Sequence, residues 1–192
     1  MDDEQTTGLL RQARAGSTDA LDALYRRYAG RLLALIRLRM GPEMRSRLES
    51  RDVLQSCLLK SFERIDQFEH AHDGSLMAWF ARIAENEIRD RIKFERRRRR
   101  DVRQELPLDA APRALEQRVR SSLSRLILGE RAAELERALD ELPADYREVI
   151  LLRKLEERSW DEIGARFGKS PDACRMLLAR AMTALTMRME HG

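Results

Sequence analysis

The chain lacks any apolar run close to the roughly 20 residues that a membrane-spanning helix needs, and its 192 residues contain only two cysteines. Cys57 and Cys174 are far apart in the sequence, and no histidine or cysteine cluster has metal-ligand spacing. We therefore expect a cytoplasmic protein with no signal peptide, no membrane insertion, no metal and no cofactor. Both cysteines should be small buried side chains in a reducing compartment.

Aromatic residues make up only 5% of the chain and glycines number 9, which does not suggest a β-sheet protein. Almost no segment alternates with period two, whereas the helical period of 3.6 recurs throughout, so the predicted fold class is all-α. With 43% hydrophobic and 36% charged residues, two small cores are more consistent with the composition than one large core. The 37 Lys and Arg nearly balance the 33 Asp and Glu, so nucleic-acid binding must depend on where the basic residues lie.

Residues 1–100 predict a small bundle of amphipathic helices. Thr18 can cap a long helix that Gly41-Pro42 stops, and a second long helix follows Ser50. After a polar stretch, Ser75 caps a third long helix. Each long helix carries one apolar stripe, so the three helices can close a bundle.

The periodic pattern loosens after residue 100. Residues 101–131 contain prolines and alternating charges, which predicts a polar linker. Residues 132–192 then predict a second helical domain. Its first helix should bury the apolar face formed by Leu135, Ala138 and Leu139.

Within this second domain the sequence predicts a helix-turn-helix. Ser159 and Glu162 form a capping box, Gly168 tolerates the left-handed end of a helix, and Ser170-Pro171 starts another helix almost at once. Two short helices joined by about three residues meet at a steep angle, as in proteins that place their second helix in the major groove.

The second helix of this motif should bury one face and present the other to DNA. The expected buried positions are Ala173, Cys174, Leu177, Leu178, Ala181 and Leu185. The expected outward positions are Asp172, Arg175, Met176, Ala179 and Arg180. Arginines there can contact phosphate or guanine, and Met or Ala can contact a thymine methyl group. The plain alternative is a helical hairpin with an ordinary polar surface.

The helix after Ser75 carries a cationic face opposite its aromatic face. Its members recur at steps of three or four and are Arg82, Asn86, Arg89, Lys93, Arg96, Arg97 and Arg100. A few such charges are common at a helix C-terminus, where they complement the dipole. A stripe over about five turns favours a track for nucleic-acid phosphates instead.

Enzymatic functions find little support in the sequence. Gly168-Lys169-Ser170 resembles the end of a phosphate-binding loop, but Ile163 occupies the position of its first glycine and a helix precedes it. No Ser or Cys has a nucleophile context, and the acids are not paired with a histidine base. His70 and His72 have no third ligand nearby. We expect a protein that is not an enzyme.

Together, the two halves resemble the extracytoplasmic-function sigma factors of bacterial RNA polymerase over nearly the whole chain. In the first half the resemblance rests on Asp52-Val53-Leu54-Gln55, Phe62, Phe68 and the run from Ala78 to Asn86 before the arginines. In the second half it runs in order and spacing from Leu142-Pro143 to Arg180-Ala181. The resemblance implies a region 2 bundle and a region 4 helix-turn-helix, joined by a polar linker.

The resemblance also implies a function and a set of contacts. A sigma factor of this type binds core RNA polymerase, recognises the minus-35 and minus-10 promoter elements and promotes DNA melting. Its implied partners are promoter DNA, the clamp helices of the largest polymerase subunit and the flap of the second-largest subunit. An anti-sigma factor stays open as a further partner.

Residue roles follow from the same resemblance. Binding of core polymerase is implied for Asp52, Gln55, Leu59 and Glu63. Minus-10 binding, with capture of a flipped base, is implied for His70, His72, Asp73, Ser75, Arg82, Asn86, Arg89, Lys93, Arg96, Arg97 and Arg100. Minus-35 binding is implied for Arg153, Asp172, Arg175, Met176, Ala179 and Arg180.

The chain departs from the family pattern at several positions. Ser56 stands where an acid is usual, and Glu157 where glycine is frequent. Basic residues common elsewhere in the family are replaced by Leu177, Met182 and Thr183. An alternative function is an autonomous helix-turn-helix transcriptional regulator with an N-terminal dimerisation or sensing domain, which should bind a palindrome unaided. A helical adaptor without nucleic acid is a third possibility.

Overall fold

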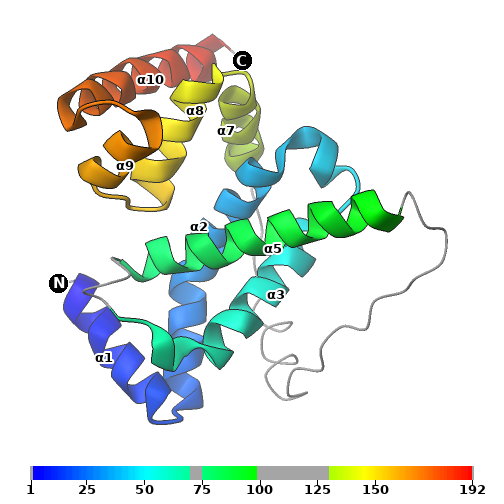
Figure 1. The fold of residues 1–192 in the computed structure, drawn as a ribbon, viewed down its shortest axis with the longest axis vertical. Coiled ribbons are helices and arrows are strands. Elements are labelled where there is room, and N and C mark those ends of the chain that lie inside the picture. The colour runs from blue at the N-terminus through cyan, green and yellow to red at the C-terminus, as the bar shows by residue number, and fades with distance from the viewer. Residues whose placement is uncertain (1, 70–74, 99–129, 192) are drawn as a thin grey trace.

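The computed structural model describes residues 2–69, 75–98 and 130–191, and within these ranges every regular element is helical (Figure 1). The predicted all-α class is confirmed. The first group of helices is α1 (Asp2–Arg14), α2 (Thr18–Arg45), α3 (Ser50–Glu63), the 3₁₀ turn η1 (Ile65–Gln67) and α5 (Leu76–Arg98). The second group is α7 (Glu130–Asp140), α8 (Ala144–Ile150), the π-helical segment η2 (Leu151–Leu155), α9 (Trp160–Phe167) and α10 (Pro171–His191).

The ends of α2 differ in detail from the prediction. Ser17, not Thr18, is the N-cap, because Ser17 is still extended and its hydroxyl accepts the backbone N–H of Ala20 at 3.3 Å. Gly41 breaks the helix with φ 67° and ψ 169°, a conformation that glycine adopts readily. One more helical turn follows from Pro42 onward, so the predicted stop is a kink rather than an end.

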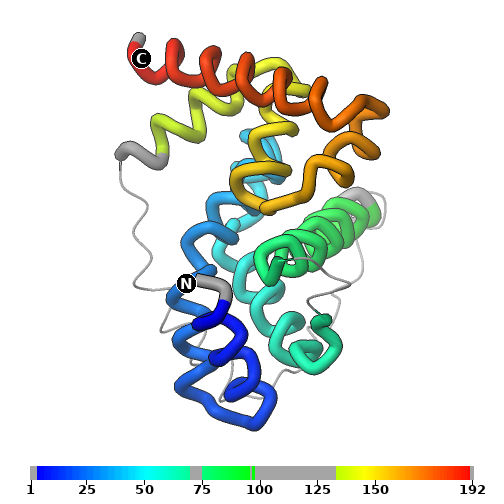
Figure 2. The backbone as a smooth tube through the Cα atoms, turned by 90° about the vertical axis from the view of Figure 1, so that its left-hand side faces the viewer, coloured from blue at the N-terminus to red at the C-terminus, as the bar shows by residue number. Residues whose placement is uncertain are grey.

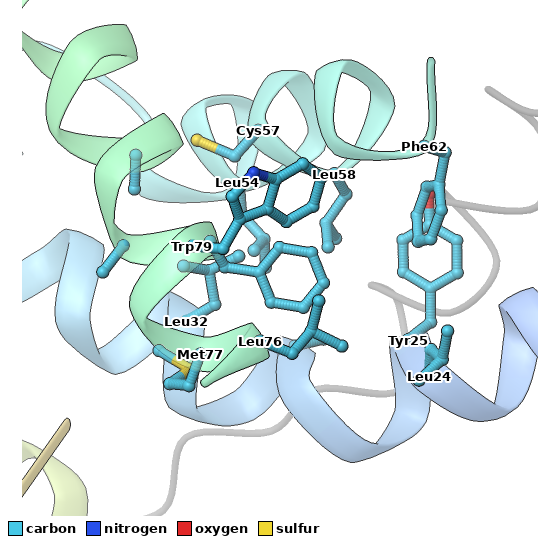
Figure 3. Packing of buried hydrophobic residues seen from close by; sticks show 14 of the residues in the cluster. Leu24, Tyr25, Leu32, Leu54, Cys57, Leu58, Phe62, Leu76, Met77 and Trp79 are labelled. Atoms are coloured by element: carbon cyan, nitrogen blue, oxygen red, sulfur yellow. The ribbon is translucent and has the colours of Figure 1, made fainter. Parts of the chain in front are cut away.

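Helices α1, α2, α3 and α5 enclose the first hydrophobic core, and Figure 3 shows side chains that α2, α3 and α5 contribute to it. Its centre is aromatic: the ring centroids of Tyr25 and Phe62 lie 4.3 Å apart, and those of Trp79 and Phe80 lie 5.5 Å apart. Cys57 is buried among these side chains, as predicted, and burial raises the pKa of its thiol. Val53, Leu54 and Leu58 are fully buried as well, which confirms the apolar stripe predicted for the helix that follows Ser50.

Helices α7 to α10 enclose a second, smaller core at one end of α2 (Figures 1 and 2). Ala138 and Leu139 are buried as predicted, but Leu135 is 39% exposed. Its predicted burial was wrong: the described side chains at 133–135 are all exposed, so the buried part of the apolar stripe begins at Ala138. One member of this second core comes from α2, since Leu38 is only 2% exposed among side chains of the second group.

The helix-turn-helix forms from α9 and α10 as the sequence predicts. The capping box is complete, with Glu162 N–H donating to the Ser159 hydroxyl at 3.2 Å and Ser159 N–H donating to the Glu162 carboxylate at 2.8 Å. Gly168 ends α9 in the left-handed region at φ 62°. Gly164 allows the close approach of the turn, because a Cβ there would lie 2.7 Å from the carbonyl oxygen of Lys169.

The predicted linker lies almost entirely outside the described residues. Its last two positions belong to α7, which begins at Glu130. No helix in the described part of the chain is both long and apolar enough to cross a membrane.

Candidate nucleic-acid interface

Helix α5 presents the first candidate surface, and its start is well defined. The Ser75 hydroxyl accepts the backbone N–H of Ala78 at 3.1 Å, which makes Ser75 the predicted N-cap. Behind this first turn, Trp79 packs on Phe68 with ring centroids 5.5 Å apart. The side chain of Ser75 thus has a structural role at the entry to α5.

The turn that leads toward α5 is held from α1. The guanidinium of Arg14 donates to the carbonyl oxygen of Ile65 at 3.2 Å and also to that of Phe68. These bonds satisfy carbonyl groups at the end of η1 and fix the direction in which the chain leaves the core. No local pattern singles out Arg14, because its partners lie more than 50 residues away.

The predicted cationic face of α5 lies at the surface wherever its side chains are described. Asn86, Arg89, Lys93 and Arg97 are exposed and Arg82 is half-buried. The side-chain amide oxygen Oδ1 of Asn86 accepts a hydrogen bond from Arg89 at 3.2 Å. The side chain of Arg96, and the residues His70, His72, Asp73 and Arg100, lie outside what the structure describes. The described members form one cationic surface along the helix.

A buried charge cluster joins α5 to α3 on a different face. Glu87 is 7% exposed and accepts from Lys60 at 2.5 Å and from Arg91 at 2.9 Å. Burial alone would raise the pKa of Glu87, but the hydrogen bonds from Lys60 and Arg91 outweigh burial and lower it. Arg91 also donates to the Ser56 hydroxyl at 2.7 Å. Arg91 is therefore occupied within the fold and does not belong to the cationic surface.

Helix α3 presents the second candidate surface, with the residues that the resemblance assigns to polymerase. Asp52 and Glu63 are exposed, and Gln55 is half-buried. Leu59 is only 9% exposed and belongs to the first core. The structure thus places three of these side chains at the surface, with Leu59 supporting the helix from beneath.

Helix α10 presents the third candidate surface. All of the predicted outward positions are exposed, namely Asp172, Arg175, Met176, Ala179 and Arg180. Cys174, Ala181 and Leu185 are buried as predicted, and Leu177 and Leu178 pack against the core while half-buried. Ala173 is exposed, contrary to prediction, because it lies in the first turn at the edge of the apolar stripe.

Trp160 links the predicted minus-35 residues into one unit that the sequence did not reveal. The guanidinium of Arg153 lies 4.8 Å from the centroid of its ring, and that of Arg175 lies 5.3 Å away. Both distances suit cation–π contacts. Arg175 also forms an ion pair with Asp172. Trp160 therefore orients two arginines from different helical segments, η2 and α10.

The base of the helix-turn-helix is held by a second charge cluster. Arg158 pairs with Glu156 at 3.3 Å and with Glu162 at 3.1 Å. Burial alone would raise the pKa of Glu162, but hydrogen bonds from Ser159 and Arg158 lower it. These contacts fix the angle at which α9 leaves η2. Among the described residues no group of three or more potential metal ligands occurs.

Two family models match this chain in the order of the two helical groups. One is described as Sigma-70 region 2 and matches residues 24–98. The other is described as Sigma-70, region 4 and matches residues 132–185. The first covers α5 and α3, and the second covers the whole helix-turn-helix.

Sequence relatives agree with these matches along most of the chain. The RNA polymerase sigma factor CarQ of Myxococcus xanthus is 30% identical over 177 residues, which is 90% of each protein. The ECF RNA polymerase sigma factor SigE of Mycolicibacterium smegmatis is 28% identical over 168 residues, or 85% of this chain and 59% of that protein.

The fold has counterparts among solved structures. The structure of CnrH in complex with the cytosolic domain of CnrY aligns with a TM-score of 0.52 at 23% identity, covering 97% of this chain and 98% of that one. At this identity the likeness concerns the fold alone.

Proposed function

The chain belongs to the extracytoplasmic-function sigma factors of RNA polymerase. We propose which of its surfaces contact polymerase and which contact each promoter element. As a sigma factor it binds core RNA polymerase and promoter DNA and directs transcription initiation. We assign residues 1–100 to region 2, 101–131 to the linker and 132–192 to region 4. Sigma factors are initiation factors that typically lack enzymatic activity, and we propose the same here, with action in the cytoplasm.

Region 2 would supply both the polymerase contact and the minus-10 contact. The exposed Asp52 and Glu63, with Gln55, form the surface of α3 that we assign to the clamp helices of the largest subunit. The cationic face of α5 would bind phosphates, since its exposed side chains are long and basic. Asn86 exposes an amide that can hydrogen-bond an unpaired base, which favours the melted state of the promoter.

Region 4 would read the minus-35 element through α10. Arg175 and Arg180 can form bidentate contacts with guanine, and Met176 can contact a thymine methyl group. Trp160 supports this assignment because its ring holds Arg175 and Arg153 in defined positions before DNA arrives. Pre-positioned side chains lose less conformational entropy on binding.

One observation carries the proposal most directly: a single chain exposes a basic helix in one group and a helix-turn-helix reading face in the other. An autonomous regulator needs only the second surface. The two surfaces together suit a factor that holds two promoter elements while polymerase opens the duplex.

Transcription in vitro tests this function. Purified chain mixed with bacterial core polymerase should start transcription at specific sites in a broad promoter library, whereas the chain alone should bind DNA poorly. Asn86→Ala should reduce opening of duplex promoters but not initiation on templates that are already melted. Core polymerase that gains no promoter-specific start sites would refute the proposal, and tight binding to a palindrome without polymerase would favour the regulator.

A further inference from the structure

Four arginines of α2 form ion pairs with acids in the second group of helices. Arg31, Arg37, Arg39 and Arg45 each form an ion pair with an acid of residues 136–157. Figures 1 and 2 show region 4 seated on the later part of α2, with α10 on the side facing away. The contact between the two regions is therefore a row of charges.

Arg39 lies at the centre of this row. Its side chain is 14% exposed and contacts the Glu148 carboxylate at 2.5 Å and the Glu156 carboxylate at 2.5 Å. Burial alone would lower the pKa of Arg39, but Glu156 and Glu148 raise it, so the guanidinium stays charged. Glu156 is fully buried and keeps Arg158 as a second partner. The central pair thus connects region 2 to the base of the helix-turn-helix.

Two further pairs fix α7 against α2. Arg37 binds Glu136 with both carboxylate oxygens engaged, one of them at 2.9 Å. Arg45 pairs with Asp140, which also lies 3.2 Å from Arg147. Bidentate arginine–carboxylate pairs are the geometrically specific ones. These contacts set the orientation of region 4 as well as its distance from region 2.

The last pair uses a residue in a strained conformation. Glu157 has φ 59°, the only positive φ among non-glycine residues in the described ranges, at the position where the family frequently has glycine. Its carboxylate accepts from Arg31 at 2.7 Å, and Arg31 also donates to the carbonyl oxygens of Lys154 and Leu155 at 3.2 Å. A left-handed glutamate is retained here although glycine would relieve the backbone, and its side chain contacts the other region.

Apolar contacts accompany these ion pairs at two described positions, because Leu155 of η2 packs half-buried against the first core and Leu38 of α2 is buried in the second. Leu38 is the member of the second core that α2 supplies, and its carbonyl oxygen accepts from Arg147. Interfaces between domains that are small and polar permit relative motion by default. Salt screens the exposed pair of Arg31 and Glu157 most, and the more buried pairs of Arg39 and Arg45 less. The contact is therefore specific and reversible.

With region 4 packed on α2, which is here called the closed arrangement, the chain is too small to contact both promoter elements at once. Elements centred about 35 and about 10 base pairs before the start lie about 25 base pairs apart, or about 85 Å at about 3.4 Å per base pair. A compact chain of this length has a radius of gyration of about 16 Å and a diameter of about 40 Å. The two regions must separate before α5 and α10 can each reach DNA.

We propose that the four arginines of α2 and the acids Glu136, Asp140, Glu148, Glu156 and Glu157 form an autoinhibitory latch that holds the free chain closed until core polymerase draws the regions apart. The reason for closure rests on the proposed function, but the closure itself does not. Only open chains can bind polymerase productively. The apparent affinity for polymerase is therefore the affinity of the open chain multiplied by the fraction of chains that are open.

Charge reversal and charge exchange test the latch on the free chain. Small-angle X-ray scattering of the full chain should give a compact particle at low salt that expands as salt rises. Arg37→Glu should expand the particle at low salt, and Arg37→Glu combined with Glu136→Arg should restore compactness. The matched control is Arg47→Glu, which removes an exposed pair with Glu43 inside region 2 and should leave the particle compact. A compact Arg37→Glu chain, or an expanded double variant, would overturn the proposal.

Glu157→Gly provides a second variant that should not endanger folding. Glycine relieves the positive φ and removes one of the three acceptors of Arg31, in an ion pair whose side chains are 39% and 40% exposed. The chain should therefore open less than Arg37→Glu does, while region 4 keeps or gains thermal stability. Opening should appear as a larger radius of gyration. A chain that stays as compact as the parent at every salt concentration would count against Glu157 as part of the latch.

Transcription separates this proposal from the function on which it rests. With core polymerase, Arg37→Glu and Glu157→Gly should reach half-maximal promoter-specific transcription at about 3- to 10-fold lower sigma concentration than the parent chain. Unchanged half-maximal concentrations in chains that scattering shows to be open would overturn the autoinhibitory role. If the scattering changes occur but no form supports transcription, the latch stands as a contact and the proposed function fails.

Discussion

The hydrophobic cores of the two regions differ in residue composition. Region 2 packs rings against one another, with Tyr25 on Phe62 and Trp79 on Phe80, and its helices are long. Among the fully described buried members of the region 4 core none is aromatic, and one of them, Leu38, belongs to α2. Region 4 depends in addition on ion pairs with region 2. From this difference we expect region 4 to depend on its contacts with region 2 more than region 2 depends on region 4.

The largest expected effect is the loss of an aromatic side chain from region 2. Phe80 is 1% exposed, so Phe80→Ala should destabilise region 2 by about 3–5 kcal/mol through lost burial and an unfilled cavity. The chain has two tryptophans, and Trp79 and Trp160 report on region 2 and region 4 respectively. Urea unfolding followed by the fluorescence of Trp79, in a Trp160→Phe background, should move to lower urea. A milder Phe80→Leu variant should shift it less.

A core substitution on α2, a helix of region 2, should affect the other region. Leu38→Ala should cost about 2 kcal/mol or more, because Leu38 is buried against side chains of region 4. The transition reported by Trp160 should move, and that of Trp79 should stay nearly unchanged. Leu32→Ala, buried in the first core, is the matched control and should move mainly the Trp79 transition, with a smaller shift of the Trp160 transition because region 4 packs on α2. Coincident shifts of both signals in both variants would contradict two separate cores.

Local signals explain why so much of the helix-turn-helix was predictable. A capping box, a left-handed glycine and an N-cap serine act within a few residues, so Ser159, Glu162, Gly168 and Ser170 determine their turns wherever the domain lies. The apolar stripes of α3 and α5 were predictable for the same reason. The apolar periodicity predicted burial wrongly at Leu135 and Ala173, which are exposed. Periodicity shows which face of a helix is apolar, but not how far along the helix its neighbours pack on that face.

Contacts across long stretches of chain were not predictable. Arg39 and Glu156 are 117 residues apart, and nothing in either local sequence marks the pair. No local signal singles out Trp160, although its ring holds two arginines. The unusual Glu157 was visible as a departure from the family, but its backbone strain and its contact with Arg31 required the fold. The residue roles on DNA and polymerase stay predictions.

Substitutions of DNA-facing residues should have smaller effects, on promoter binding, and these effects should differ between the two regions. Arg175→Ala should cost about 1–3 kcal/mol at the upstream element if Arg175 contacts a base, and the loss should vanish when that base is changed. Lys93→Ala should weaken binding to all promoters about equally and reduce the salt slope by about 1, as expected for a phosphate contact. Binding of the polymerase holoenzyme to promoter variants at several salt concentrations measures both. A uniform loss for Arg175→Ala would reassign it to phosphate.

The smallest effect concerns acid stability, and it compares one buried with one exposed glutamate. Hydrogen bonds and charges lower the pKa of both Glu87 and Glu162, so each group stabilises the fold above the pKa of the unfolded chain and loses that contribution as pH falls through its own lower pKa. Glu87 is nearly buried with two cationic partners, whereas the Glu162 side chain is 50% exposed and screened by water. Acidification below about pH 4.3, the ordinary glutamate value, should therefore lower the Trp79 transition more steeply than the Trp160 transition. Glu87→Gln should flatten the first dependence, and Glu162→Gln should change the second only slightly. An equal acid sensitivity of the two transitions would mean that the buried cluster between α3 and α5 contributes no more to stability than a surface helix cap.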